Sequence, residues 1–326
     1  MRVKISSIAY HLASNEEDLE ILTDENPEWD IDKITEKTGI FKRFISSPNE
    51  TATDLAYIAA SKLIKSLDTP NNIDLLILVT QSPDYTIPTS ACILQDRLNL
   101  SKNCMAFDVN LGCSGFVYAL SVAGSLIDSG VAQKGLIICS DTYTKYIKKN
   151  DRTCRPIFSD GAAAILLEPS NNNDIGPFDF GTDGSGYEHL IVRGSGLRKN
   201  IALNNNSIRN LEMAGSEIFL FTLREVPNSI ERLMLRTGIT LDDINLVIFH
   251  QASKLVIDSL IKSVNIPKSK VFNNLHQIGN TVSASIPIAL SNAESQKKLK
   301  SGDLVLLVGF GVGLSWGSTT IRWKQK

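Results

Sequence analysis

The stretch CMAFDVNLGCSGFVYALSVAGSLIDS at residues 104–129 decides the fold. Residues 104–109 predict a short buried strand, and residues 110–112 predict a tight turn that leads Cys113 into the first turn of a helix. This helix carries no charge before Asp128 and is rich in small residues. Because it is apolar on all sides and too short to span a bilayer, we expect it in the middle of a layered core.

Cys113 is a candidate nucleophile. Gly112 and Gly115 flank it and let backbone and substrate approach the sulfur, while the free N–H groups and the dipole of the helix favour a thiolate. Free cysteine is also among the most buried residue types, so the local sequence leaves a packing role for Cys113 open. Packing in or near the core is the role expected for the other four: Cys92, Cys104, Cys139 and Cys154.

Composition excludes several classes of function. The 326 residues are 43% hydrophobic and have a formal net charge of −2 without long charged blocks, so neither nucleic acid nor a membrane surface is expected as a partner. The N-terminus lacks the apolar segment of a signal peptide, and no run reaches the ~18 apolar residues of a membrane helix, which predicts a cytoplasmic protein. Five cysteines without framework spacing predict reduced thiols, and the four histidines lack metal-ligand spacing, so we expect no metal.

The order of the predicted elements indicates two copies of one α/β unit. The motif DLLILVTQSPD at 74–84 aligns with INLVIFHQASK at 244–254, and an amphipathic helix precedes each. We therefore expect an α/β fold of two pseudo-symmetric halves, residues 1–170 and 171–326, whose like-placed loops face each other and share a site. Apolar runs predict the strands of the first half at residues 3–9, 74–80, 104–109, 135–141 and 158–169.

Polar and irregular segments lie around these elements. A short helix is predicted at residues 15–22, and Trp29 is expected to be exposed beside a basic cluster, as either a solvated connector or a ligand surface. The Asn- and Gly-rich stretch 170–212 predicts irregular surface. Pro227 should kink or divide a long helix at 216–236, and another helix is expected at 281–297. The basic cluster consists of Lys37, Lys42 and Arg43.

Two polar residues of the second half are candidate partners for Cys113. His250 ends the apolar strand residues LVIF, and Asn280 lies in GNTVSAS after Gly279. Taken alone, such a histidine is usually a hydrogen-bonded structural group and such an asparagine an ordinary helix cap. Their joint placement at the ends of elements that face the first half favours a shared site with Cys113.

With these motifs the chain resembles the β-ketoacyl-acyl-carrier-protein synthase III family, condensing enzymes of the thiolase superfamily. The similarity covers nearly the whole chain, in family order. The resemblance implies a thiolase-like five-layer αβαβα fold, a homodimer, and an acyltransferase with no permanently bound cofactor. Its substrates would be an acyl-CoA primer and malonyl-acyl-carrier protein. The motifs are NLGCSGFVYAL around Cys113, FSDGAAAILLE at 158–168, FHQAS around His250, GNTVSAS around Asn280 and GFGVGLSWGS at 309–318.

The resemblance also implies how the reaction proceeds. An acyl group would pass from CoA to Cys113, and a decarboxylative Claisen condensation with malonyl-acyl-carrier protein would give a 3-oxoacyl-acyl-carrier protein. His250 and Asn280 would donate hydrogen bonds to the malonyl thioester oxygen and stabilise the enolate. Backbone N–H groups of Cys113 and Val312 would hold the oxyanion of the acyl-cysteine, with Val312 at a position where relatives often carry glycine.

Further positions match the binding residues of this family. Arg152 matches the arginine that contacts the CoA adenine, and Gly215 and Ala252 match positions of the pantetheine tunnel. Trp29 resembles the tryptophan on the other side of the adenine, although it stands nine residues before Thr38 instead of about five.

Two more positions concern the carrier protein and the primer. Lys254 lies near the arginine used for carrier-protein docking, where either a docking cation or a merely solvated lysine fits. Ile87 falls where some relatives have a phenylalanine that closes the acyl pocket across the dimer interface, which predicts a longer or branched primer.

Two alternative functions stay open from the sequence. One is a thiolase-superfamily acyltransferase with a different acceptor, in a specialised secondary-metabolite or polysaccharide pathway. The other is a non-catalytic acyl-binding subunit, against which the intact set of Cys113, His250 and Asn280 argues.

Overall fold

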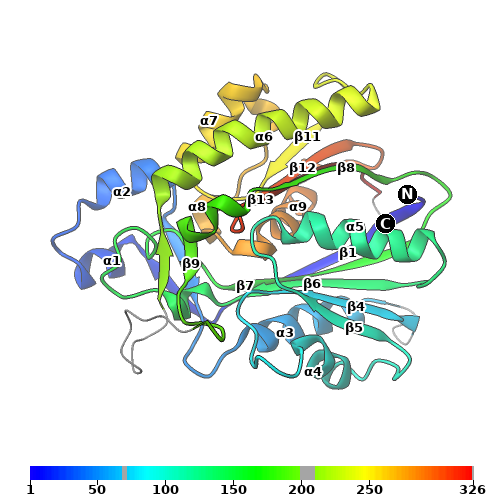
Figure 1. The fold of residues 1–326 in the computed structure, drawn as a ribbon, viewed down its shortest axis with the longest axis horizontal. Helices are drawn as coiled ribbons and strands as arrows, with labels where there is room; N and C mark the ends of the chain where they lie inside the picture. The colour runs from blue at the N-terminus through cyan, green and yellow to red at the C-terminus, as the bar shows by residue number, and fades with distance from the viewer. Residues whose placement is uncertain (68–71, 199–209, 325–326) are drawn as a thin grey trace.

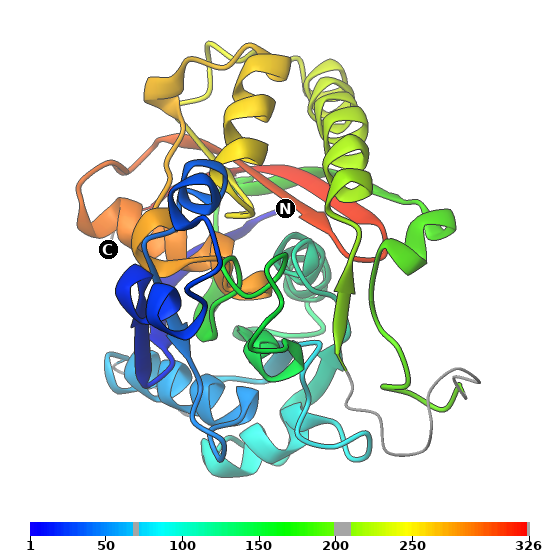
Figure 2. The same ribbon diagram turned by 90° about the vertical axis from the view of Figure 1, so that its left-hand side faces the viewer.

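A computed structural model describes residues 1–67, 72–198 and 210–324 of the chain (Figure 1). Their elements stack as helices, sheet, helices, sheet and helices, and Figure 2 shows this stack from the end where α1 (Leu19–Glu25) and α2 (Ile31–Thr38) lie. The predicted α/β class is confirmed. None of the described helices combines the length and apolar content needed to cross a membrane.

The first sheet has the strand order β1-β7-β6-β4-β5. Strand β4 pairs in parallel with β5 and β6, and β7 is antiparallel to β1 and β6. Both β4 and β6 are buried throughout, as their apolar runs predict. Strand β5 was expected to be buried, but it lies at the sheet edge and Met105 is 41% exposed. The strands are β1 (Val3–Leu12), β4 (Leu75–Val79), β5 (Met105–Val109), β6 (Gly135–Asp141) and β7 (Gly161–Pro169).

The second sheet repeats this topology with the strand order β11-β12-β13-β8. Strand β11 is parallel to β12, and β13 is antiparallel to β12 and β8, which is the succession found in β4, β6, β7 and β1. From this correspondence we propose that the halves divide between β7 and β8, at residues 1–170 and 171–326. The strands are β8 (Ile175–Thr182), β11 (Leu246–Phe249), β12 (Leu304–Gly311) and β13 (Ser315–Arg322).

Helices cover both sheets and fill the space between them. In Figure 1, α3 and α4 lie below the first sheet, α5 and α9 lie between the sheets, and α6 and α7 lie above the second. The central position of α5 confirms the prediction, although Val122 is 41% exposed and gives the helix a partly open side. The helices are α3 (Ala52–Lys65), α4 (Ser90–Arg97), α5 (Gly115–Asp128), α6 (Gly215–Thr237), α7 (Lys254–Val264), α8 (Leu275–Ile278) and α9 (Ser285–Ser295).

Several predicted boundaries differ from the structure. Helix α6 runs through Pro227 without dividing, and a short 3-10 turn, η5 (Val282–Ala284), precedes α9 where one helix was predicted. The other 3-10 turns are η2 (Tyr143–Tyr146), η3 (Gly184–His189) and η4 (Lys268–Lys270).

The stretch 170–212 is not irregular throughout, because β8, β9 (Leu190–Val192) and β10 (Leu211–Met213) lie in it. Strand β8 contains Gly176 and Pro177, which are turn signals in a sequence, and only its pairing with β13 reveals the strand. Residues 203–207, which belong to the same prediction, lie outside the described residues.

The segment before residue 48 also differs from its prediction. Residues 15–18 form β2 (Asn15–Asp18), which pairs with β3 (Lys42–Ile45), and the predicted helix begins only at Leu19. Trp29 is 8% exposed and therefore buried. Arg43 is buried as well, because its guanidinium pairs with Glu17 and donates to the Phe158 carbonyl oxygen at 3.0 Å. The expected exposed cluster therefore does not form.

Candidate active site

Cys113 lies in the turn between β5 and α5, immediately before the N-cap residue Ser114. Strand β12 passes directly over this turn. A Cβ at Gly311 would lie 2.8 Å from the Cβ and 3.0 Å from the Sγ of Cys113, and one at Gly309 would lie 2.9 Å from the Cα of Ser114. Only glycine lets β12 approach this closely, so β12 helps to fix the position of Cys113.

Burial controls the protonation of Cys113, which is 5% exposed. Loss of solvation, and then the nearby Asp141 carboxylate, raise the pKa of the thiol to about 12. The backbone N–H groups of Cys113 and Val312 face the sulfur and lower the pKa in part. The N–H groups therefore act in the predicted direction, but burial outweighs them and the pKa of the thiol is raised.

His250 follows β11 and is 2% exposed. Burial lowers the pKa of its imidazole to about 3, so the ring is neutral at neutral pH. Its Nδ1 lies 2.7 Å from the Ser285 hydroxyl oxygen, which accepts a hydrogen bond from the Gln251 N–H at 3.5 Å. If the Ser285 O–H donates to Nδ1, the ring proton lies on Nε2.

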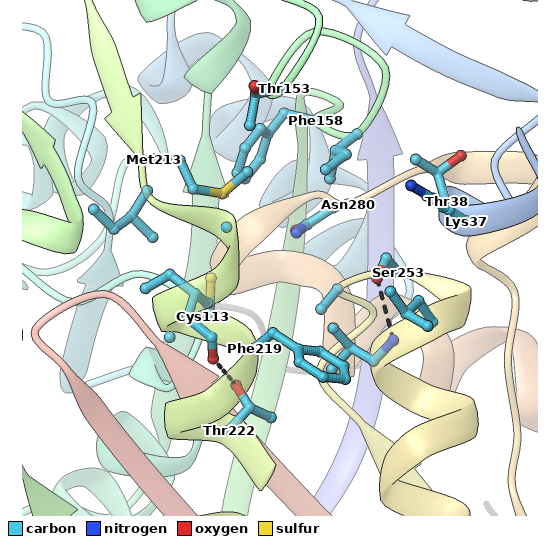
Figure 3. Close-up of a pocket in the computed structure, with 18 of the residues that line it drawn as sticks. Lys37, Thr38, Cys113, Thr153, Phe158, Met213, Phe219, Thr222, Ser253 and Asn280 are labelled. Atoms are coloured by element: carbon cyan, nitrogen blue, oxygen red, sulfur yellow. Dashed lines mark hydrogen bonds between the residues drawn. The ribbon is translucent and has the colours of Figure 1, made fainter. Parts of the chain in front are cut away.

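Asn280 is 4% exposed and is held on both sides by backbone hydrogen bonds. Its N–H donates to the Ile157 carbonyl at 3.0 Å, and its carbonyl accepts from the Ser159 N–H at 2.9 Å. The side-chain Oδ1 accepts from the Val282 N–H at 2.9 Å. The carboxamide therefore presents its NH₂ group to the cavity, as Figure 3 shows.

The three candidate catalytic residues line the same cavity, which has a volume of about 620 Å³. Figure 3 shows Cys113 and Asn280 pointing into this space beside Phe158, Met213 and Phe219. The three side chains form its buried end, and exposed cations lie at its other end. Arg152, Gly215 and Ala252 also line the cavity, so it contains six of the site residues predicted from the sequence.

The other predicted residues lie outside this lining. Trp29 is buried and is not among the residues that line the cavity, and Ile87, which is 86% exposed, is not among them either. Lys254 lines a neighbouring cavity of about 510 Å³ and pairs with Asp258 at 3.1 Å. The Val312 side chain packs over Gly112, although its N–H faces Cys113.

Several lining residues were missed in the sequence. Lys33 is one of them: it pairs with Asp30 at 2.6 Å and lies one helical turn from Lys37, the member of the predicted basic cluster that does line the cavity. Ile218 and Phe219 share the face of α6 with Gly215, a spacing that could have indicated them. No sequence signal marks the lining residues of β9 and β10, Leu190 and Met213.

The buried end combines the thiol of Cys113 with two neutral side chains that can donate hydrogen bonds, the imidazole of His250 and the carboxamide of Asn280. A site of this kind can form a covalent thioester and can stabilise negative charge on a second carbonyl oxygen. Among the residues that the structure describes, no group of three or more His, Cys, Asp and Glu side chains is arranged to hold a metal ion.

Comparison with known proteins gives a consistent result. Family models described as 3-oxoacyl-[acyl-carrier-protein (ACP)] synthase III and as its C-terminal part match residues 107–184 and 234–323. Beta-ketoacyl-[acyl-carrier-protein] synthase III of Clostridium perfringens strain SM101 is 39% identical over 96% of this chain and 95% of its own. The protein of the same name from Thermosynechococcus vestitus is 35% identical over 94% and 93%.

Solved structures agree with the sequence comparison. A crystal structure of 3-oxoacyl-(acyl-carrier-protein) synthase III superposes with a TM-score of 0.96 at 38% identity, covering 99% of this chain and all of the other. The corresponding enzyme of Aquifex aeolicus gives a TM-score of 0.90 at 34% identity, with 98% and 100% covered. The priming β-ketosynthase of the R1128 polyketide pathway gives a TM-score of 0.92 at 26% identity, with 99% and 96% covered.

Proposed function

Because the chain belongs to the 3-oxoacyl-[acyl-carrier-protein] synthase III family, we propose that Cys113, His250 and Asn280 are the catalytic residues of its condensation reaction. The family matches confirm the predicted family, the thiolase-like fold and the acyltransferase class. The protein is a condensing enzyme of the fatty-acid initiation type. One observation carries the residue assignment: the three side chains come from different elements of both halves and line one buried cavity end.

In the first half-reaction, Cys113 takes the acyl group of an acyl-CoA. The sulfur attacks the thioester carbonyl, the bond from that carbon to the CoA sulfur breaks, and the thiol proton leaves with CoA. The N–H groups of Cys113 and Val312 stabilise the oxyanion, because both face the sulfur.

In the second half-reaction, His250 and Asn280 stabilise an enolate. Nε2–H of the neutral imidazole and Nδ2–H of the carboxamide donate to the malonyl thioester oxygen while CO₂ leaves and its bonding electrons form the enolate. The enolate carbon then attacks the acyl carbonyl, the bond from that carbon to Sγ of Cys113 breaks, and the released thiolate takes up a proton from solvent to restore the thiol. Loss of one such donor typically costs roughly 3–4 kcal/mol of transition-state stabilisation.

The exposed cavity end suits phosphate-bearing carriers, here acyl-CoA and the phosphopantetheine arm of an acyl carrier protein. Lys33, Lys37 and Arg152 are cations that line this end, while Gly215 and Ala252 leave room for a narrow arm. Lys254, beside the entrance, is proposed as a point charge for carrier-protein docking. We assign no CoA contact to Trp29, because it is buried and is not among the residues that line the cavity.

We also propose a homodimer formed at the edge of the first sheet. Strand β5 has no partner on its outer side within the described chain, and an open edge with apolar side chains favours pairing with a second copy. Exposed apolar residues on β5, its neighbouring loop, α5 and β8 support this interface: Met105, Tyr85, Ile87, Val122 and Phe180. Analytical ultracentrifugation should give twice the mass of the chain, and a monomer at micromolar concentration would contradict the interface. The cytoplasmic location stays a prediction.

Separate measurement of the two half-reactions tests the catalytic assignment. After incubation with acetyl-CoA, intact-mass spectrometry should find the acetyl adduct on the wild-type enzyme and on His250→Ala and Asn280→Ala, but not on Cys113→Ala. Release of CO₂ from malonyl-acyl-carrier protein should fall roughly 100- to 1000-fold in the His250 and Asn280 variants. Acetylation of Cys113→Ala to the wild-type extent would refute the assignment. Absence of CO₂ release by the acylated wild-type enzyme would favour a different acceptor.

A further inference from the structure

Asp141 is a buried carboxylate that joins the two halves of the chain. It ends β6 in the first half, is fully buried, and is not among the proposed catalytic residues. We propose that Asp141 is a positioning residue for the condensation step, because it holds the donor segment, residues 280–285. This segment begins with Asn280 and ends with Ser285, the partner of His250. The inference rests on the proposed function, since it concerns how the two enolate donors are held.

Both oxygens of the Asp141 carboxylate accept hydrogen bonds. Oδ1 accepts from the Gln81 N–H at 2.8 Å and from the Thr80 hydroxyl at 3.5 Å, so it binds the residues that follow β4. Oδ2 accepts from the Ser283 N–H at 3.2 Å and, in a short bond, from the Ser283 hydroxyl. One carboxylate therefore connects the end of β4 in the first half to the middle of the donor segment in the second.

The first-half side of this connection is rigid. Asp141 pairs with Gly161 of the neighbouring strand β7. Gln81 is fixed as well, because its side chain accepts a hydrogen bond from the Tyr143 hydroxyl and its carbonyl oxygen accepts from the Tyr146 hydroxyl at 3.3 Å. A shift of the carboxylate would break several buried hydrogen bonds, and that is costly.

The backbone of the donor segment requires such a restraint. Val282 is fully buried and has a φ of +54°, which β-branched residues rarely adopt. A strained conformation of this kind persists only where the surrounding structure fixes it. Asp141 fixes the next residue, Ser283, through both its N–H and its hydroxyl. The carboxylate is therefore a contact that keeps Val282 in this conformation.

Both enolate donors depend on the donor segment. The Val282 N–H donates to Oδ1 of Asn280 at 2.9 Å, so the orientation of the Asn280 carboxamide follows that of Val282. Ser285 lies 2.7 Å from Nδ1 of His250 and orients the imidazole. Cys113 belongs to a different turn, which β12 holds in place. Loss of the Asp141 connection should therefore impair condensation and spare acylation of Cys113.

Asp141→Asn breaks the connection with little change in side-chain volume. An asparagine in the same orientation has one acceptor oxygen, so its NH₂ group must face the N–H of either Gln81 or Ser283, and neither can accept. The substitution also removes a negative charge that raises the pKa of Cys113, which favours ionisation of the thiol. Burial raises the pKa of Asp141 itself to about 7, so rates are compared at pH 8.5, where the wild-type carboxylate is charged.

The test measures two rates at pH 8.5. Acetylation of Cys113 by acetyl-CoA is followed by intact-mass spectrometry, and condensation is followed as release of CO₂ from malonyl-acyl-carrier protein. The ratio of CO₂ release to acetylation is the readout, because partial unfolding lowers both rates and cancels. Asp141→Asn should lower this ratio about 10- to 100-fold, since displacing a reacting group by about 1 Å costs roughly a hundredfold. Acetylation itself should not fall.

Ser283→Ala tests the same connection from its other end. It removes the hydroxyl and keeps the N–H that Asp141 accepts, so the ratio should fall about three- to tenfold. This variant serves if Asp141→Asn does not fold. In the double variant the ratio should fall no further than in Asp141→Asn alone, because both changes break one connection.

Two buried sites elsewhere supply matched controls. Asp174 is 1% exposed, accepts a hydrogen bond from the Ser170 hydroxyl and pairs with Lys324. Ser229 is fully buried, and its hydroxyl oxygen lies 2.8 Å from that of Ser318. Neither Asp174 nor Ser229 is among the residues that line the cavity. Asp174→Asn and Ser229→Ala should therefore leave the ratio unchanged, even where they lower the thermal midpoint.

Four results would overturn the inference. An equal fall of both rates in Asp141→Asn would show that the residue only supports the fold. A control variant that lowers the ratio as much as Asp141→Asn would remove the special place of Asp141. Additive losses in the double variant would show that Asp141 does not act through Ser283. A wild-type enzyme that is acetylated but releases no CO₂ would refute the proposed condensation, and the inference with it.

Discussion

The close passage of β12 over Cys113 predicts a large effect of Gly311→Ala. The added Cβ would lie 2.8 Å from the Cβ and 3.0 Å from the Sγ of Cys113. Carbon atoms in contact are normally about 3.5–4.0 Å apart, so the sulfur or the strand must move by roughly 1 Å. The φ of +156° at residue 311 adds backbone strain, because L side chains rarely adopt it.

The magnitude follows from these contacts. Overpacking a filled interior costs about 1–3 kcal/mol of the free energy of unfolding. Displacing a nucleophile by about 1 Å costs roughly a hundredfold in rate, because the attack geometry is lost. We therefore expect Gly311→Ala to fold with a lower thermal midpoint and to lose about 99% of the wild-type kcat/KM for acetylation of Cys113.

Two other glycines supply matched controls. Gly302 has a φ of +96° and no atom within 4 Å of an added Cβ, so Gly302→Ala should lower the thermal midpoint and leave acetylation unchanged. Gly184 has neither neighbour nor positive φ, so Gly184→Ala should alter neither quantity. Acetylation of Gly311→Ala at the wild-type rate, measured by intact mass, would refute the claim that β12 positions the sulfur.

Three further predictions concern protonation, positioning and charge. Burial raises the Cys113 pKa to about 12, so the rate of its alkylation by iodoacetamide should rise about tenfold per pH unit from pH 7 to 10. The rate is followed on the peptide that contains Cys113, and a rate that is already constant near pH 7 would show a thiolate. Ser285→Ala should lower the rate of decarboxylation about tenfold and leave acetylation unchanged, because His250 loses the partner that orients its ring. A nitrogen-15 spectrum of the imidazole should then show a mixture of the two tautomers. Lys37→Gln should raise KM for acetyl-CoA several-fold with little change in kcat, an effect that 0.5 M salt should reduce.

The sequence predicts those parts of the molecule that short segments specify by themselves. Strands β4, β6 and β11 follow from uninterrupted apolar runs, and the catalytic set follows from motifs that keep Cys113, His250 and Asn280 in family order. Each of these signals lies within about ten neighbouring residues. Their meeting in one cavity follows from the repeat, because equivalent loops of two packed copies face one another.

The parts that sequence reasoning missed depend on partners far along the chain. Strand β8 pairs with β13 more than 130 residues later, and Trp29 is buried by the packing of its neighbours. The Tyr143–Gln81 hydrogen bond joins residues 62 positions apart, and neither residue is unusual in its own segment. Sequence reasoning missed the raised pKa of Cys113 for another reason. The local sequence shows that a helix starts there, but the degree of burial is a property of the whole fold.

The same burial that raises the pKa of Cys113 supports the role proposed for His250. Removing water raises the pKa of the thiol to about 12 and lowers the pKa of the imidazole to about 3. Both shifts oppose transfer of the proton from sulfur to imidazole, so the two residues do not form the thiolate–imidazolium pair of a cysteine protease. Because Ser285 occupies Nδ1, Nε2 is the ring nitrogen left for a substrate, and with the proton on Nε2 the neutral imidazole is the donor that a developing enolate requires. The buried cavity end therefore suits condensation, because it places the Cys113 thiol beside two donors that can activate a carbon nucleophile.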